Sequence, residues 1–211
     1  MDDVVEEKNK IARFHNLLIR PNIGEFLGAF FFSFLACFAG QCQRSNGLIY
    51  PFLSAFSLYI SRSLVLPLTP AHLNPAVTFL HWLRNEVPLA IAVTFCLVQL
   101  VGFLFGVSLF RSLVSQTEFN DYVVMYEIVA VDGVRKINRL QGFIQFVSYP
   151  LYGFTSNITL LLVTSTVSYI FSPLTTPSFL LLYLNVFASL IAALAAWCLD
   201  LLCQRSVEEE E

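Results

Sequence analysis

The sequence predicts an all-α membrane protein with five or six transmembrane helices and one re-entrant half-helix. The first reason is composition: 56% of the 211 residues are hydrophobic and only 13% are charged, about half the charged share of a soluble domain. The second reason is that long apolar segments, each able to cross a bilayer, alternate with polar ones. The third is a polar break at 70–74, which is followed by an apolar run too short to cross.

This short apolar run begins at Pro75 and ends before Arg84. Pro75 lacks an N–H and has a φ angle suited to the first helical position, with Asn74 as the N-cap in front of it. Roughly ten residues extend about 15 Å as a helix, which is half of a ~30 Å hydrocarbon core. A half-length helix is tolerated at that depth only where protein surrounds it or where it lines a wet cavity. The sequence therefore predicts a re-entrant element here.

The segment His72–Thr78 reads His-Leu-Asn-Pro-Ala-Val-Thr and resembles the first Asn-Pro-Ala box of the aquaporin (major intrinsic protein) superfamily. The resemblance implies an aquaporin-like helical bundle and a channel for water or small neutral solutes. In such a pore an asparagine amide replaces the hydrogen bonds that water loses, and the half-helix N-terminus repels cations. The resemblance assigns the donor role to Asn74, the start of the half-helix to Pro75 and Ala76, and an acceptor role to the His72 carbonyl.

The resemblance also assigns residues outside the box. Glu25 matches the glutamate with which the first aquaporin helix holds the re-entrant loop; a glutamate that dips into the headgroups is the simpler interpretation. Gln99 and Gly102 resemble the Gln-x-x-Gly of the third helix, although an ordinary interhelical hydrogen bond also explains Gln99. Phe56 lies where the family has an aromatic side chain at the pore constriction.

The first half of the chain divides at residue 20. Residues 1–20 are polar, and their basic residues favour a cytosolic N-terminus; an amphipathic helix on the membrane surface and a frayed tail both fit this segment. Residues 21–110 are expected to form a first aquaporin-like repeat. Its spans are expected at about 23–41, 48–66 and 87–110, with the half-helix between the second and the third.

The second half is shorter than a full repeat requires. Residues 111–140 are too charged to span and are expected to form an extramembrane loop. A degenerate second repeat is expected at 141–203, with a short piece at 141–149, spans at 151–171 and 178–199, and an acidic tail at 204–211. Gln145 is expected to take the supporting place that Glu25 has in the first repeat. Asn157-Ile158-Thr159 fits the glycosylation pattern but lies in an apolar run, and we expect it to be unmodified.

This half departs from the family pattern in two respects. No second Asn-Pro-Ala box is present: 169–176 resembles the approach to it, but 177–180 then reads Pro-Ser-Phe-Leu. A weaker candidate at 184–187 leaves too little chain for a last helix. No Lys, Arg or His occurs between 140 and 205, so the arginine that follows the second box in the family is missing.

Two functions remain open on these observations. The first is a divergent aquaporin-like channel, and the second is a non-conducting, aquaporin-derived membrane scaffold or interaction protein. Either would be a multi-pass protein of the plasma membrane or an intracellular membrane, and the resemblance implies a homotetramer. The sequence has no metal-ligand spacing, acid–base pair, nucleophile triad or phosphate loop, so we expect no cofactor, no metal and no enzymatic activity. No basic stripe with interleaved aromatic residues suggests nucleic-acid binding.

Overall fold

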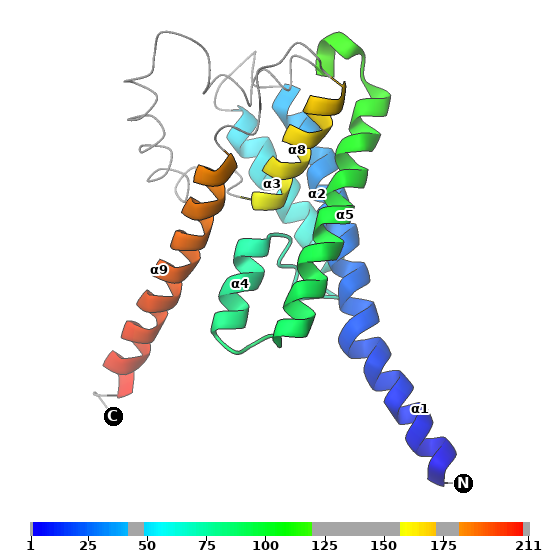
Figure 1. Cartoon of the computed structure of the whole chain (residues 1–211), viewed down its shortest axis with the longest axis vertical. Helices are drawn as coiled ribbons and strands as arrows, with labels where there is room; N and C mark the ends of the chain where they lie inside the picture. Colours follow the sequence, from blue (N-terminus) through cyan, green and yellow to red (C-terminus); the bar gives the residue numbers. More distant parts are fainter. Residues whose placement is uncertain (1, 42–48, 120–156, 172–181, 209–211) are drawn as a thin grey trace.

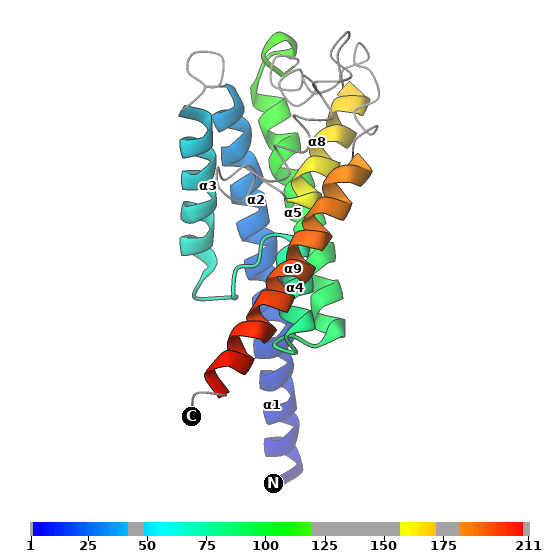
Figure 2. The same ribbon diagram turned by 90° about the vertical axis from the view of Figure 1, so that its left-hand side faces the viewer.

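The computed structural model of the chain describes residues 2–41, 49–119, 157–171 and 182–208. Every regular element in these stretches is a helix, which confirms the all-α prediction. Three of the helices run side by side along the length of an elongated bundle (Figures 1 and 2). They are α2 (Arg20–Gln41), α3 (Ile49–Val65) and α5 (Leu89–Leu113).

The polar N-terminal segment and the first span form one helical rod. α1 (Asp2–Phe14) passes through a short π-helix, η1 (His15–Ile19), directly into α2. Pro21 has no N–H to donate, and the rod stays helical through it with the π-turn directly in front. The side-chain amide of Asn22 donates to the carbonyl of Leu18 at 2.7 Å. The N-terminal segment is therefore helical rather than frayed, and it prolongs the axis of α2 (Figure 1).

Two glycines of α5 allow this helix to approach α2 closely. A Cβ atom on Gly102 would lie 2.4 Å from the carbonyl oxygen of Phe26, and one on Gly106 would lie 2.1 Å from Ser33 Oγ. Both distances are shorter than real Cβ contacts, so neither position has room for a side chain. Around this contact the core consists mainly of aromatic and small side chains from α2, α5 and α8, namely Phe32, Ala36, Cys37, Phe103, Val107, Phe110, Leu160 and Val163.

This close contact predicts the effect of a larger side chain on α5. Gly106→Leu should lower the free energy of unfolding by about 3 kcal/mol, because the new side chain would overlap Ser33 and the backbone of α2. Ser108→Leu is the matched control, since Ser108 is exposed on the same helix. Thermal unfolding in detergent would measure both. Equal melting temperatures for the two variants would contradict the close packing.

Two short helices begin near the middle of the bundle and run in opposite directions (Figure 1). α4 (Pro75–Leu83) has nine residues and runs toward the end that holds both termini, whereas α8 (Ile158–Phe171) has 14 residues and runs toward the other end. At helical rise they extend about 14 Å and about 21 Å, both less than the hydrocarbon thickness. In the described part of the span predicted at 151–171, the helix begins at Ile158. The last helix, α9 (Leu182–Glu208), crosses back to the end where the chain begins (Figure 2).

Two helical stretches in the described residues are long and apolar enough to cross a membrane, judged by length and composition: Glu6–Ala39 and Leu89–Leu113. The first and last described residues lie at the same end of the bundle (Figures 1 and 2). The loop predicted at 111–140 and the piece at 141–149 fall largely outside the described residues.

Candidate functional site

The most polar part of the interior surrounds the carboxylate of Glu25, which is fully buried on α2. Its Oε1 accepts hydrogen bonds from Thr69 Oγ1 at 2.7 Å and from the backbone N–H of His72 at 2.9 Å. Its Oε2 accepts from the backbone N–H of Leu73 at 2.9 Å and from Gln99 Nε2 at 2.8 Å. Four donors therefore converge on one buried carboxylate. They also tie the loop in front of α4 to α2 and α5.

The loop backbone adopts an unusual conformation to make these bonds. Ala71 and Leu73 have φ angles of 56° and 49°, in the left-handed region that residues other than glycine rarely adopt. Successive N–H groups in such a conformation form a concave site for an anion, which the Glu25 carboxylate fills here. A Cβ atom on Gly28 would lie 2.5 Å from Leu73 Cδ2, so the glycine lets the loop lie against α2.

Asn74 and Pro75 begin α4 as the sequence predicts. Asn74 is the N-cap, and its Oδ1 accepts a hydrogen bond from the backbone N–H of Ala76 at 3.0 Å. Pro75 occupies the first turn, where no N–H is needed. The hydroxyl of Thr78 donates to the carbonyl of Asn74 at 3.2 Å and accepts from Gln99 Nε2 at 3.2 Å. The first turn of α4 is therefore held by the same side chains that surround Glu25.

His72 fills the space between this network and the rest of α4. Only 4% of its surface is exposed. Its ring stacks on His81 with centroids 4.2 Å apart and meets the edge of Phe95 at 5.6 Å. His72 Nδ1 lies 3.2 Å from Thr78 Oγ1. The other ring nitrogen, Nε2, is buried without a partner among the described residues. That the His72 carbonyl faces a solute path stays a prediction.

The far end of α4 carries a charged cluster. His81 Nδ1 contacts Glu86 Oε2, and Arg84 Nε lies 2.8 Å from Glu86 Oε1 and 3.4 Å from Asp200 Oδ2 on α9. The hydrogen bond from His81, with the charge of Arg84 in addition, lowers the pKa of Glu86 below its usual value of 4.5. These contacts join the end of α4 to the last helix.

The lowered pKa predicts how the contribution of Glu86 to the stability of the folded chain changes with pH. A group whose pKa is lower in the folded chain stabilises it above the unfolded-state pKa, and this stabilisation disappears as the pH falls through the folded-state pKa. Glu86→Gln should therefore destabilise the chain slightly at pH 7 and lose its effect below about pH 4, as unfolding in detergent would measure. The effect is small because 40% of the Glu86 side chain is exposed. In a chain that already carries His81→Gln, the destabilisation caused by Glu86→Gln should be smaller still. An equal destabilisation in the two chains would contradict the assignment of the lowered pKa to the hydrogen bond from His81.

One residue of this region, Asn157, was assigned no functional role by the sequence analysis. It lies in front of α8, is 4% exposed, and its side-chain Nδ2 donates to the carbonyl of Leu73. An asparagine before an apolar run is the same N-cap signal that marks α4, but here no proline follows it. The side chain is buried and hydrogen-bonded, which agrees with the expectation that this acceptor pattern is unmodified.

The other predicted site residues lie elsewhere. Phe56 is 49% exposed on α3, so it does not belong to the buried cluster around Glu25. Gln145 lies outside the described residues. In the part of the chain that the structure describes, no group of three or more His, Cys, Asp or Glu side chains is arranged to hold a metal ion.

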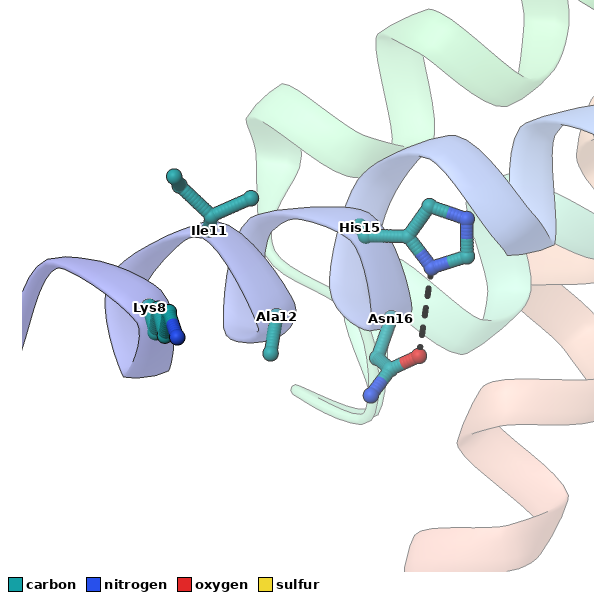
Figure 3. A pocket seen from close by; sticks show the side chains of 5 residues that line it. All are labelled: Lys8, Ile11, Ala12, His15 and Asn16. Carbon is teal, nitrogen blue, oxygen red and sulfur yellow. Dashed lines mark hydrogen bonds between the residues drawn. The ribbon is translucent and has the colours of Figure 1, made fainter. Parts of the chain in front are cut away.

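A shallow pocket on the N-terminal rod is separate from this cluster. Lys8, Ile11, Ala12, His15 and Asn16 line it, and His15 Nδ1 lies 3.4 Å from Asn16 Oδ1 (Figure 3). All of these residues are exposed and come from α1 and η1 alone. The pocket is a feature of the rod's surface.

A bundle of long apolar helices with a capped half-helix anchored in its interior is the arrangement of a membrane protein with a re-entrant element. Comparison with known families agrees with this class. The sequence model of the family described as Major intrinsic protein matches residues 12–175. The chain therefore belongs to the major intrinsic protein family, and the resemblance seen in its sequence is confirmed. No curated protein matches the chain.

Membership settles the general character of the protein. Major intrinsic proteins are integral membrane channels rather than enzymes, and they pass water or small solutes across the bilayer. The prediction of an all-α membrane channel fold is confirmed, and so is the prediction that the chain is not an enzyme.

Proposed function

We propose that the chain conducts water or small neutral solutes along a path that passes Asn74. The observation that carries the proposal is the fixed position of the α4 N-terminus, since Glu25 holds the preceding loop through the N–H groups of His72 and Leu73. The partial positive charge of this helix end would oppose the entry of cations. Gln99 supports the arrangement through its bonds to Glu25 and Thr78.

The proposal includes the organisation of the chain. Residues 21–110 would form the first repeat, 141–203 a degenerate second repeat, and 1–20 a cytosolic segment. The generally tetrameric assembly of the family supports a homotetramer, which native mass spectrometry of the detergent-solubilised chain would test.

A non-conducting scaffold is the second candidate. Two observations favour it: the sequence has no second Asn-Pro-Ala box, and it has no basic residue between 140 and 205. Without these groups the path has fewer fixed charges to exclude ions. The chain would then act in the membrane through assembly with itself or with other proteins.

Osmotic swelling of proteoliposomes separates the two candidates. Liposomes with the intact chain should swell faster than empty liposomes, and Asn74→Asp should reduce the rate to that of empty liposomes. Aspartate keeps the acceptor for Ala76 but loses the amide donor and adds a charge in a low-dielectric region. The matched control is Asn16→Asp, since Asn16 is exposed on η1. Equal swelling for the intact chain and empty liposomes would overturn the channel proposal in favour of the scaffold.

A further inference from the structure

The side chain of Asn157 contacts the first turn of α8 and the loop that leads into α4. Its Oδ1 accepts hydrogen bonds from the backbone N–H groups of Thr159 at 3.1 Å and Leu160 at 3.2 Å, which caps α8. Its Nδ2 donates to the carbonyl of Leu73, in the loop that leads into α4. One side-chain amide therefore caps α8 with its oxygen and bonds the loop before α4 with its nitrogen.

We propose that Asn157 is a positioning residue that fastens the N-terminal end of α8 to the loop in front of α4. In this role it substitutes for the second Asn-Pro-Ala box that the sequence lacks. The bond holds two short helices that run in opposite directions with their N-termini together near the middle of the bundle (Figure 1). Any consequence for solute passage rests on the proposed function, whereas the fastening itself does not.

The backbone of Leu73, whose carbonyl receives this bond, is held on both sides of its Cα atom. The N–H of Leu73 donates to Glu25 Oε2 at 2.9 Å, and its carbonyl accepts from Asn157. Leu73 is fully buried and has a φ angle of 49°, a conformation that persists only where the surroundings determine it. Asn157 thus completes the set of contacts that fixes the loop, and it comes from a helix far along the chain.

The chemistry of the site explains why an asparagine is suited to this position. Both helix N-termini carry partial positive charge, so their approach is unfavourable without a bond between them. A neutral amide supplies an acceptor for the N–H groups of α8 and a donor for the Leu73 carbonyl. Aspartate would cap α8 equally well, but its carboxylate would face the carbonyl oxygen of Leu73 without a proton to donate.

Hydrogen exchange of the chain in lipid nanodiscs tests the proposal. Asn157→Asp should speed exchange of the His72 and Leu73 amides about tenfold, the effect of losing a bond worth about 1.4 kcal/mol, and leave Thr159 and Leu160 protected. Asn157→Ala removes both the bond to Leu73 and the cap on α8, so it should speed exchange in the loop before α4 and in the first turn of α8. Asn16→Asp should change neither. If Asn157→Asp leaves His72 and Leu73 as protected as in the unaltered chain, the residue is a cap only and the proposal is overturned.

A second measurement needs no variant and covers the case in which the variants do not fold. In the unaltered chain, the amides of Leu73 and Leu160 should open in one cooperative step and share one dependence on denaturant. Independent opening of the two segments would overturn the proposal. Neither measurement depends on transport, so a failure of the swelling assay would contradict the proposed function and leave this inference standing.

Discussion

Glu25→Gln should destabilise the folded chain by about 4 kcal/mol, which is the scale for breaking a buried, hydrogen-bonded charge site. Four donors point at the carboxylate, and glutamine offers one oxygen together with an NH₂ group that would face two of them. The expected result is a sharp loss of folded, monodisperse protein and a much lower melting temperature in detergent. Size-exclusion chromatography and thermal unfolding would measure both.

A double-mutant cycle with Gln99 identifies the cause of this loss. Gln99→Leu removes one of the four donors, so Glu25→Gln should cost less in that background, and the two changes should couple by about 1 kcal/mol or more. Glu7→Gln is the control, since Glu7 is exposed on α1. A Glu25→Gln variant as stable as Glu7→Gln would show that the carboxylate does not hold the loop.

Ala71→Val should destabilise the chain by about 3 kcal/mol. Ala71 is fully buried with a φ angle of 56°, where a β-branched side chain is strained and the surrounding core has no room for it. Ala71→Gly at the same position should leave the stability unchanged or raise it, because glycine adopts this conformation without strain. Thermal unfolding of the pair would measure the difference. Similar losses for valine and glycine would point to lost packing rather than to the backbone conformation.

Local sequence signals predicted the secondary structure of the site better than the contacts between its residues. The Asn74-Pro75 pair marks a helix start by itself, because capping and the fixed φ of proline are properties of neighbouring residues. The convergence of Glu25 and Gln99 on the loop was accessible only through the family resemblance. Their positions along the chain, 74 residues apart, contain no local signal that they meet.

Three further features show what local sequence signals do not predict. Asn157 joins a loop 84 residues earlier in the chain, and its weaker cap signal was interpreted only as a glycosylation pattern. The helical rod passes through Pro21 with a π-turn in front of it, which composition does not reveal. Phe56 is one of 21 phenylalanines, and its place at a pore constriction rests on the family resemblance alone and stays a prediction.

The contact between α2 and α5 limits which parts of the protein can move. At Gly102 and Gly106 the backbone of α5 lies directly against α2, so α5 has no side chain at these positions that could repack if the helices slid past each other. Glu25 and Gln99 extend from these same two helices and bond to each other. Helices α2 and α5 therefore form a rigid pair, to which the loop before α4 is attached. Among the described helices, α3, α8 and α9 are then the ones whose movement against this pair would change the width of the interior.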